Sequence, residues 1–174
     1  MKTRVATAWL SGCSGCHMSL LDIDERLLDL ADKIELVYGP MVDTKEFPEK
    51  VDVTLVEGSV ANVDNETTIR RIRGRTRLLV SLGDCAVTGN VPSMRNYFEK
   101  EVVLRRVYAR AGDNEHIPVD VPALLSPVRP IHSIVKVDLF VPGCPPSADV
   151  IHFTISELLQ GRIPQVDSLT RFGK

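Results

Sequence analysis

The 174-residue sequence lacks a marked charge imbalance, a long apolar run and an N-terminal leader pattern. Its 21 basic and 23 acidic residues leave a net charge of −2, which gives no long-range attraction for nucleic acid or an anionic membrane. No apolar stretch approaches the length of a transmembrane helix, and the first residues run straight into a predicted strand without signal-peptide regions. We therefore expect a cytoplasmic protein with no nucleic acid and no membrane as partner.

Cysteine is scarce, with four residues in the whole chain, and all four stand in sequences typical of turns. Cys13 and Cys16 form a C-x-x-C pair, a spacing that lets two sulfurs bind one centre. Cys85 lies in Gly-Asp-Cys and Cys144 in Pro-Gly-Cys-Pro-Pro, turn sequences that expose a thiol rather than bury it. In a reducing compartment, four cysteines favour metal binding or redox chemistry over a disulfide framework.

Predicted strands and helices alternate along the chain, which is the pattern of an α/β fold. Several strands are almost continuously apolar, as expected where a parallel sheet is buried on both faces. We predict one flavodoxin-like domain over residues 1–174, a doubly wound, five-stranded parallel sheet in the order 2-1-3-4-5. The predicted strands span residues 5–10, 34–38, 51–56, 78–82 and 135–141, and the predicted helices 20–31, 65–73, 97–110 and 148–160.

Two further expectations concern the core and one long connection. Trp9, Tyr38 and Phe140 are expected in the core. The proline-rich stretch 111–133 is too long for a simple connection, and we expect a loop that covers a partner or the functional site.

Each cysteine group directly follows a predicted strand. Because the carboxyl ends of parallel strands meet at one edge of a sheet, the four thiols are expected to arrive together. Four thiolates hold either zinc or an iron–sulfur cluster. Zinc is less favoured, since its ligands usually come as two paired knuckles and here Cys85 and Cys144 are single. A thioredoxin-like dithiol would leave Cys85 and Cys144 without a purpose.

These motifs resemble the small-subunit signature of [NiFe] hydrogenases, in particular of the cytoplasmic NAD-reducing (soluble) type. The resemblance covers essentially the whole chain, and its motifs are GCSGCHMS at 12–19, VEGSV at 56–60, GDCA at 83–86 and PGCPP at 142–146. Membrane-bound and periplasmic small subunits are similar in their N-terminal half, but they add a cysteine-rich domain and a twin-arginine signal that this sequence does not show. This difference from the membrane-bound and periplasmic small subunits fits the short cytoplasmic type.

The resemblance implies a single [4Fe-4S] cluster with Cys13, Cys16, Cys85 and Cys144 as its ligands. It also implies a hydrogenase large subunit that carries the nickel-iron centre. Electrons from dihydrogen would pass through the cluster to diaphorase subunits that hold further iron-sulfur clusters, FMN and the NAD site. The chain itself would contain no complete active site, and it would act as a subunit of a hydrogen:NAD+ oxidoreductase.

The proximal-cluster subunit of respiratory complex I belongs to the same broader family and is the alternative. That subunit is similar in fold and in the Gly-Cys-Pro-Pro motif, but its first two cysteines are adjacent. The two-residue separation of Cys13 and Cys16 therefore favours a hydrogenase. A cluster-bearing subunit of a quinone or other oxidoreductase remains the second hypothesis.

Glu57 and His17 are the remaining candidates near the cysteines. Glu57 ends the third strand, and the resemblance implies proton transfer near the large-subunit interface; a helix-capping or surface acid is the alternative. His17 would hydrogen-bond a cluster sulfur or face the partner, against the alternative of a solvated turn histidine.

A flavin on this chain is a separate question, because the loop that holds phosphate in a flavodoxin is occupied here by Cys13 and Cys16. An FMN would need a displaced site near Ser59, Asn62 or Asn90, and no glycine-rich cradle is visible there. Polar turn residues are the favoured interpretation of these three.

Overall fold

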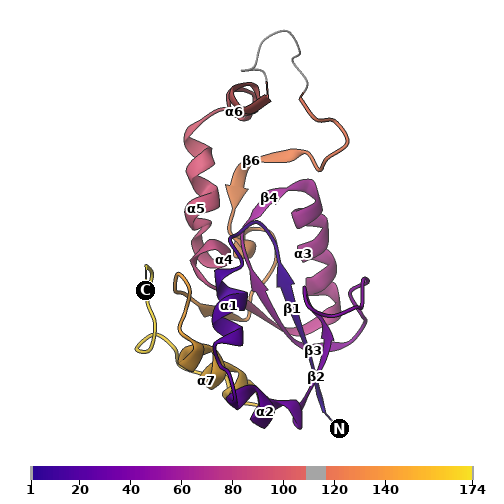
Figure 1. Ribbon diagram of the computed structural model, residues 1–174, viewed down its shortest axis with the longest axis vertical. Coiled ribbons are helices and arrows are strands. Elements are labelled where there is room, and N and C mark those ends of the chain that lie inside the picture. Colours follow the sequence, from indigo (N-terminus) through magenta and orange to yellow (C-terminus); the bar gives the residue numbers. More distant parts are fainter. Residues whose placement is uncertain (1, 109–116, 174) are drawn as a thin grey trace.

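The computed structural model describes residues 2–108 and 117–173. A five-stranded parallel sheet in the order β2-β1-β3-β5-β7 forms its centre (Figure 1). Its strands are β1 Thr3–Trp9, β2 Ile34–Tyr38, β3 Val51–Glu57, β5 Thr76–Leu82 and β7 Leu139–Val141. Numbered within this sheet alone, the order is 2-1-3-4-5, so the predicted doubly wound flavodoxin-like sheet is confirmed.

Helices cover both faces of the sheet, and each face has its own apolar core (Figure 1). Side chains alternate between faces along a strand, so Val5 and Ala6 of β1 belong to different cores. Three helices pack on the Val5 face: α1 Gly15–Leu21, α2 Arg26–Ala31 and α7 Ala148–Leu159. On the Ala6 face, α3 Val63–Arg75 buries Ile69 and Ile72 completely.

A small two-stranded sheet lies beyond the main sheet and joins β4 Val60–Asn62 to β6 Leu124–Arg129 in antiparallel pairing (Figure 1). The nearby helices are α4 Asp84–Thr88, α5 Asn90–Ser93, η1 Met94–Tyr97, α6 Lys100–Tyr108 and η2 Ile131–Ser133. The prediction of a loop over 111–133 is therefore wrong for residues 124–133, while residues 111–116 lie outside the described part. Val128 and Ile131 are buried and fix this segment, and a two-stranded edge tolerates Pro127.

Three other predicted boundaries are also corrected. The predicted helix over 20–31 is broken between α1 and α2, where Asp24 adopts φ 59. Acids at 22, 24 and 25 oppose the negative C-terminal end of a helix, and aspartate tolerates the left-handed region. The predicted helix over 97–110 begins at Lys100, and its last two residues lie outside the described part.

The last strand is shorter than predicted, because it begins at Leu139 rather than at residue 135. Directly before it, the Leu79 N–H donates to a carboxylate oxygen of Asp138 at 2.8 Å. The Asp138 N–H still donates to the Leu79 carbonyl at 2.9 Å, so the side chain takes the place of only one ladder hydrogen bond before β7.

The aromatic residues expected in the core are mostly at its margin. Trp9 is 50% exposed and Phe140 39% exposed, so the core prediction is wrong for both. Trp9 ends β1 beyond the helices, and its Nε1 donates to the Gly12 carbonyl at 3.3 Å. Tyr38 is half-buried and packs edge-on against Phe47 at 5.1 Å between ring centroids.

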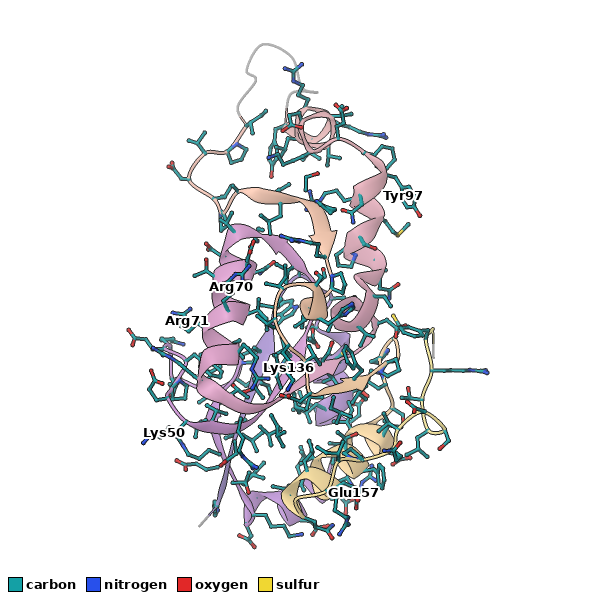
Figure 2. All side chains as sticks on the ribbon, turned by 180° about the vertical axis from the view of Figure 1, so that it is seen from behind. Lys50, Arg70, Arg71, Tyr97, Lys136 and Glu157 are labelled. Carbon is teal, nitrogen blue, oxygen red and sulfur yellow. The ribbon has the colours of Figure 1, made fainter. Side chains whose placement is uncertain are left out.

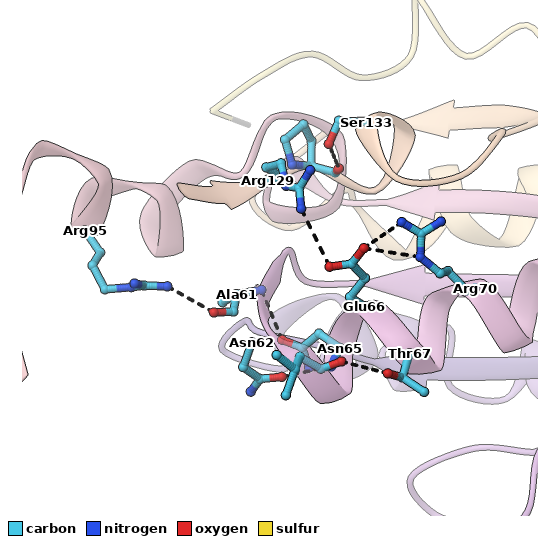
Figure 3. Close-up of polar contacts among 11 residues, drawn as sticks. Ala61, Asn62, Asn65, Glu66, Thr67, Arg70, Arg95, Arg129 and Ser133 are labelled. Atoms are coloured by element: carbon cyan, nitrogen blue, oxygen red, sulfur yellow. Dashed lines mark hydrogen bonds and ion pairs between the residues drawn. The ribbon is translucent and has the colours of Figure 1, made fainter. Parts of the chain in front are cut away.

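Polar contacts attach the small sheet to α3 (Figure 3). Glu66 accepts two hydrogen bonds from Arg70 and lies 3.6 Å from Arg129 of β6. Asn62 caps α3 by accepting from the Asn65 N–H at 2.8 Å. Arg70 and Arg71 lie on the outer side of α3 (Figure 2). In the part of the chain that the structure describes, no helix is long and apolar enough to cross a membrane.

Candidate metal centre

The structure places all four cysteines beyond the carboxyl ends of the parallel strands, on three connections at the same edge of the sheet. Cys13 and Cys16 follow β1, Cys85 follows β5 and Cys144 follows β7. Between β1 and β5, strand β3 ends at Glu57, which pairs with Trp9 and Leu82 across the sheet. Cys13 and Cys144 are exposed, and Cys16 and Cys85 are half-buried. The exposure predicted from the turn sequences is therefore confirmed for Cys144 and only in part for Cys85.

Gly83 brings the β5 connection against the sulfur of Cys16. Its backbone has φ 80 and ψ 161, a combination available almost only to glycine. A Cβ atom at this position would lie 2.2 Å from Cys16 Sγ. The first and second cysteine groups therefore meet at a point where no side chain fits.

Asp84 joins the Cys85 connection to the Cys144 connection. Its Oδ1 accepts the Gly143 N–H at 2.7 Å, and its own N–H donates to the Gly143 carbonyl at 2.8 Å. Oδ2 accepts the Gly173 N–H at 2.8 Å, so the same carboxylate also holds the C-terminal segment. Asp84 is buried, and hydrogen bonds to a carboxylate are stronger where water is excluded. These bonds therefore hold the Cys85 and Cys144 connections together.

Glu57 and His17 form a buried pair beside Cys16. The Glu57 Oε2 atom accepts the His17 backbone N–H at 2.7 Å and lies 3.0 Å from Nδ1 of the same residue's ring. Because this N–H belongs to the first turn of α1, the carboxylate caps the helix that carries Cys16. The capping alternative for Glu57 therefore fits its geometry, whereas the interpretations of a surface acid and of a solvated histidine are wrong. Proton transfer through Glu57 stays a prediction.

The sulfurs influence one another electrostatically. Burial, the Glu57 carboxylate and the three other thiols all raise the pKa of Cys16. Burial, together with Cys13 and Cys144, raises the pKa of Cys85. Neighbouring thiolates repel one another, so a positively charged metal group would allow all four to be deprotonated together.

Zinc and an iron–sulfur cluster place four thiolate ligands at different separations. Tetrahedral zinc would draw four sulfurs to about 3.8 Å from one another, given Zn–S bonds of about 2.3 Å. Within residues 2–108 and 117–173, no three Cys, His, Asp or Glu side chains gather closely enough to hold one metal ion. A cluster carries its own sulfides and several irons, and it spreads its four thiolate ligands further apart.

The three positions proposed for a flavin are engaged within the chain. Ser59 is buried and donates to the Ser11 carbonyl, and Asn62 caps α3. Asn90 directs its amide Nδ2 at Cys144 Sγ, at 3.4 Å. These contacts favour the interpretation as structural polar residues.

Sequence reasoning predicts the gathering of the cysteines but misses two residues of the site. Asp84 stands inside the Gly-Asp-Cys motif, yet nothing in one sequence reveals that its carboxylate reaches Gly143 and Gly173. From the sequence Asn90 is a candidate only for a flavin, because its contact with Cys144 joins the start of α5 to the connection after β7, 54 residues further along the chain.

An α/β protein whose doubly wound sheet gathers four thiols at one edge has the donor set of a metal-binding redox subunit. Comparison with known proteins defines the family. Residues 13–158 match the model of the NADH ubiquinone oxidoreductase 20 Kd subunit family. The chain belongs to this family, and the broader family resemblance predicted from the sequence is thereby confirmed.

Individual relatives are hydrogenase subunits. The chain is 40% identical over 168 residues to the NAD-reducing hydrogenase HoxS subunit delta of Cupriavidus necator, covering 92% of this chain and 80% of that protein. It is 33% identical over 155 residues to the sulfhydrogenase 2 subunit delta of Pyrococcus furiosus, covering 89% of this chain but only 61% of that relative.

Solved structures agree with these relatives. The crystal structure of an NAD+-reducing [NiFe]-hydrogenase in the H2-reduced state matches with a TM-score of 0.93 and 42% identity, over 99% of both chains. The Ni-Fe-Se hydrogenase of Desulfomicrobium baculatum matches with a TM-score of 0.62 over 96% of this chain and 68% of that chain. At 20% identity, the second match shows a shared fold alone.

Proposed function

We propose that this chain, as one domain over residues 1–174, is the electron-transfer small subunit of a cytoplasmic NAD-reducing [NiFe] hydrogenase. The observation that carries the proposal is the gathering of all four cysteines of the chain at one sheet edge. The agreement over nearly the full length with an NAD-reducing hydrogenase supports it. We further propose that Cys13, Cys16, Cys85 and Cys144 bind one [4Fe-4S] cluster.

Such a cluster, when bound, takes up and releases one electron at a time. The residues of this chain supply its thiolates and fix their positions. Glu57 caps the helix that carries Cys16, and Asp84 holds the connections of Cys85 and Cys144 together. The half-burial of Cys16 and Cys85 limits the access of water from the side of the protein.

An exposed apolar strip beside the cysteines supports the proposed partner, a large subunit with the nickel-iron centre. The strip runs over α5, η1 and α6, and its members are 54–87% exposed: Val91, Met94, Tyr97, Phe98 and Val102. Tyr97 points away from the body of the protein (Figure 2). None of the side chains of the nine-residue helix α6 is buried, and so short a helix is marginal in water without a packing partner.

The strip begins at the proposed cluster site, because Asn90 touches Cys144 and Val91 follows it directly. One partner can therefore cover both the sulfurs and the strip. An obligate interface of this kind buries upward of about 2,000 Å² and is more apolar than ordinary surface. We expect the chain to be unstable or insoluble without its partner; a well-behaved monomer with a complete cluster would contradict this.

Replacement of Cys144 by serine in the assembled enzyme tests the function. We expect the variant to lose hydrogen-driven NAD reduction, whereas the oxidation of NADH by an artificial dye continues through the proposed diaphorase subunits. Gel filtration must first show that the subunits still assemble. Hydrogen-driven NAD reduction at the wild-type rate, in an assembled variant that lacks the cluster by spectroscopy, would refute the assignment.

A cluster-bearing subunit of a complex I-like quinone oxidoreductase is the second candidate, and the description of the matched family favours it. Metal analysis of the co-purified complex separates the two candidates. Nickel supports the hydrogenase, and iron without nickel supports the alternative.

A further inference from the structure

Asn90 is the one side chain that hydrogen-bonds a cysteine sulfur in the described part of the chain. Its Nδ2 lies 3.4 Å from Cys144 Sγ. Asn90 follows Gly89 at the start of α5 and adopts φ 33, a backbone conformation that asparagine tolerates better than most residues. A metal-bound thiolate can only accept a hydrogen bond, so the NH2 end of the amide is the end that must face it.

A hydrogen bond to a ligand sulfur shifts the reduction potential of an iron–sulfur cluster. Reduction adds negative charge, part of which resides on the sulfurs. A donor N–H interacts more strongly with the reduced state than with the oxidised state, and it therefore raises the reduction potential. The exposure of Cys144 does not remove this effect, because the amide lies in direct contact with the sulfur.

We propose that Asn90 sets the reduction potential of the cluster through its hydrogen bond to Cys144 Sγ. The inference rests on the proposed function only for the identity of the ligands, and it concerns the potential rather than the presence of the cluster. Asn90 acts through Cys144 and is therefore a positioning and tuning residue.

The experiment is a redox titration of the co-purified complex, followed by electron paramagnetic resonance of the reduced cluster. Asn90→Gly suits the backbone at φ 33 and removes the amide. Asn90→Asp keeps the shape but presents an acceptor in place of the donor. Loss of a hydrogen bond to a charged group lowers the equilibrium constant for reduction about tenfold, which is about 59 mV for one electron.

We expect the potential to fall in the order wild type, Asn90→Gly, Asn90→Asp. Ser93→Ala is the matched control, because Ser93 Oγ donates to the Asn90 carbonyl and leaves the amide contact untouched. This control should titrate as the wild type does.

Equal potentials in the wild type and both Asn90 variants would overturn the proposal and leave the proposed function intact. Loss of the cluster from both variants, with a normal Ser93→Ala control, would also overturn it, because Asn90 would then hold the loop rather than set the potential. A wild-type complex without any iron–sulfur signal would refute the proposed function instead.

Discussion

Replacing Gly83 by alanine should separate the stability of the fold from the integrity of the metal site. The new Cβ atom would lie 2.2 Å from Cys16 Sγ, and the backbone would hold alanine at φ 80 and ψ 161. The backbone conformation costs about 1–3 kcal/mol. The collision is relieved when Cys16 rotates about its single side-chain torsion. The remaining cost is smaller than the total stability of a typical domain, about 5–15 kcal/mol, so we expect the fold to survive.

The same rotation moves the Cys16 sulfur away from the other three cysteines. We therefore expect the Gly83→Ala complex to contain about four irons and four sulfides fewer than the wild-type complex, which is one [4Fe-4S] cluster, while the subunits remain folded. The assay is iron and acid-labile sulfide per small subunit in the complex recovered from gel filtration, together with the thermal unfolding midpoint.

Gly161→Ala is the matched control, because Gly161 has a similar φ of 75 but no atom within 4 Å of the place that a Cβ atom would take. It should lower stability by the conformational cost alone, about 1–2 kcal/mol, and keep its iron. A full iron content in Gly83→Ala, or an equal loss in both variants, would refute the reasoning.

Three further outcomes are expected. Asp84→Asn weakens two charge-assisted hydrogen bonds, to Gly143 and Gly173. The free energy of unfolding should therefore fall by about 1–3 kcal/mol in thermal or denaturant unfolding. An unchanged stability would contradict the role of Asp84 in holding these segments together. Burial opposes the charge of Asp138, but the Leu79 N–H and Arg73 outweigh it and hold the pKa of Asp138 below its ordinary value. Asp138→Asn should therefore be less stable than wild type by about 1 kcal/mol near neutral pH, and the difference should close as the pH falls through the lowered folded-state pKa; a pH-independent difference would contradict this. Phe98→Ser combined with Val102→Ser should weaken assembly with the partner in gel filtration, because both residues belong to the exposed apolar strip. Leu28→Ser changes an exposed apolar residue of α2 outside the strip and should leave assembly unchanged. Equal effects would contradict the assignment of the strip to the partner interface.

The sheet order and the meeting of the cysteines could be predicted from the sequence, because strand-period apolar runs and the turn motifs that follow them are local signals. The stretch 51–56, for example, is apolar or β-branched at almost every position and is buried along nearly its whole length. The parallel topology then places Cys13, Cys85 and Cys144 at one edge without further information.

What the sequence could not predict depends on contacts between distant residues. The break at Asp24 follows from local charge, but the burial of Glu57 against His17 requires β3 and α1 to lie side by side. Strand β6 forms because Val128 finds a place in the small sheet, not because its proline-interrupted sequence favours a strand. Residue type alone predicts Trp9 in the core, and its position at the end of β1 leaves it half-exposed.

The central claim is that the four cysteines of this chain hold one [4Fe-4S] cluster in a complex with a hydrogenase large subunit. The most direct test is metal and sulfide analysis of the small subunit within the co-purified complex, together with electron paramagnetic resonance of the reduced sample. The account predicts that the complex loses four irons and four labile sulfides per small subunit when Cys13, Cys16, Cys85 and Cys144 are replaced by serine, while the iron of the partner subunits remains. One zinc ion per chain, or an unchanged iron content in the fourfold variant, would contradict it.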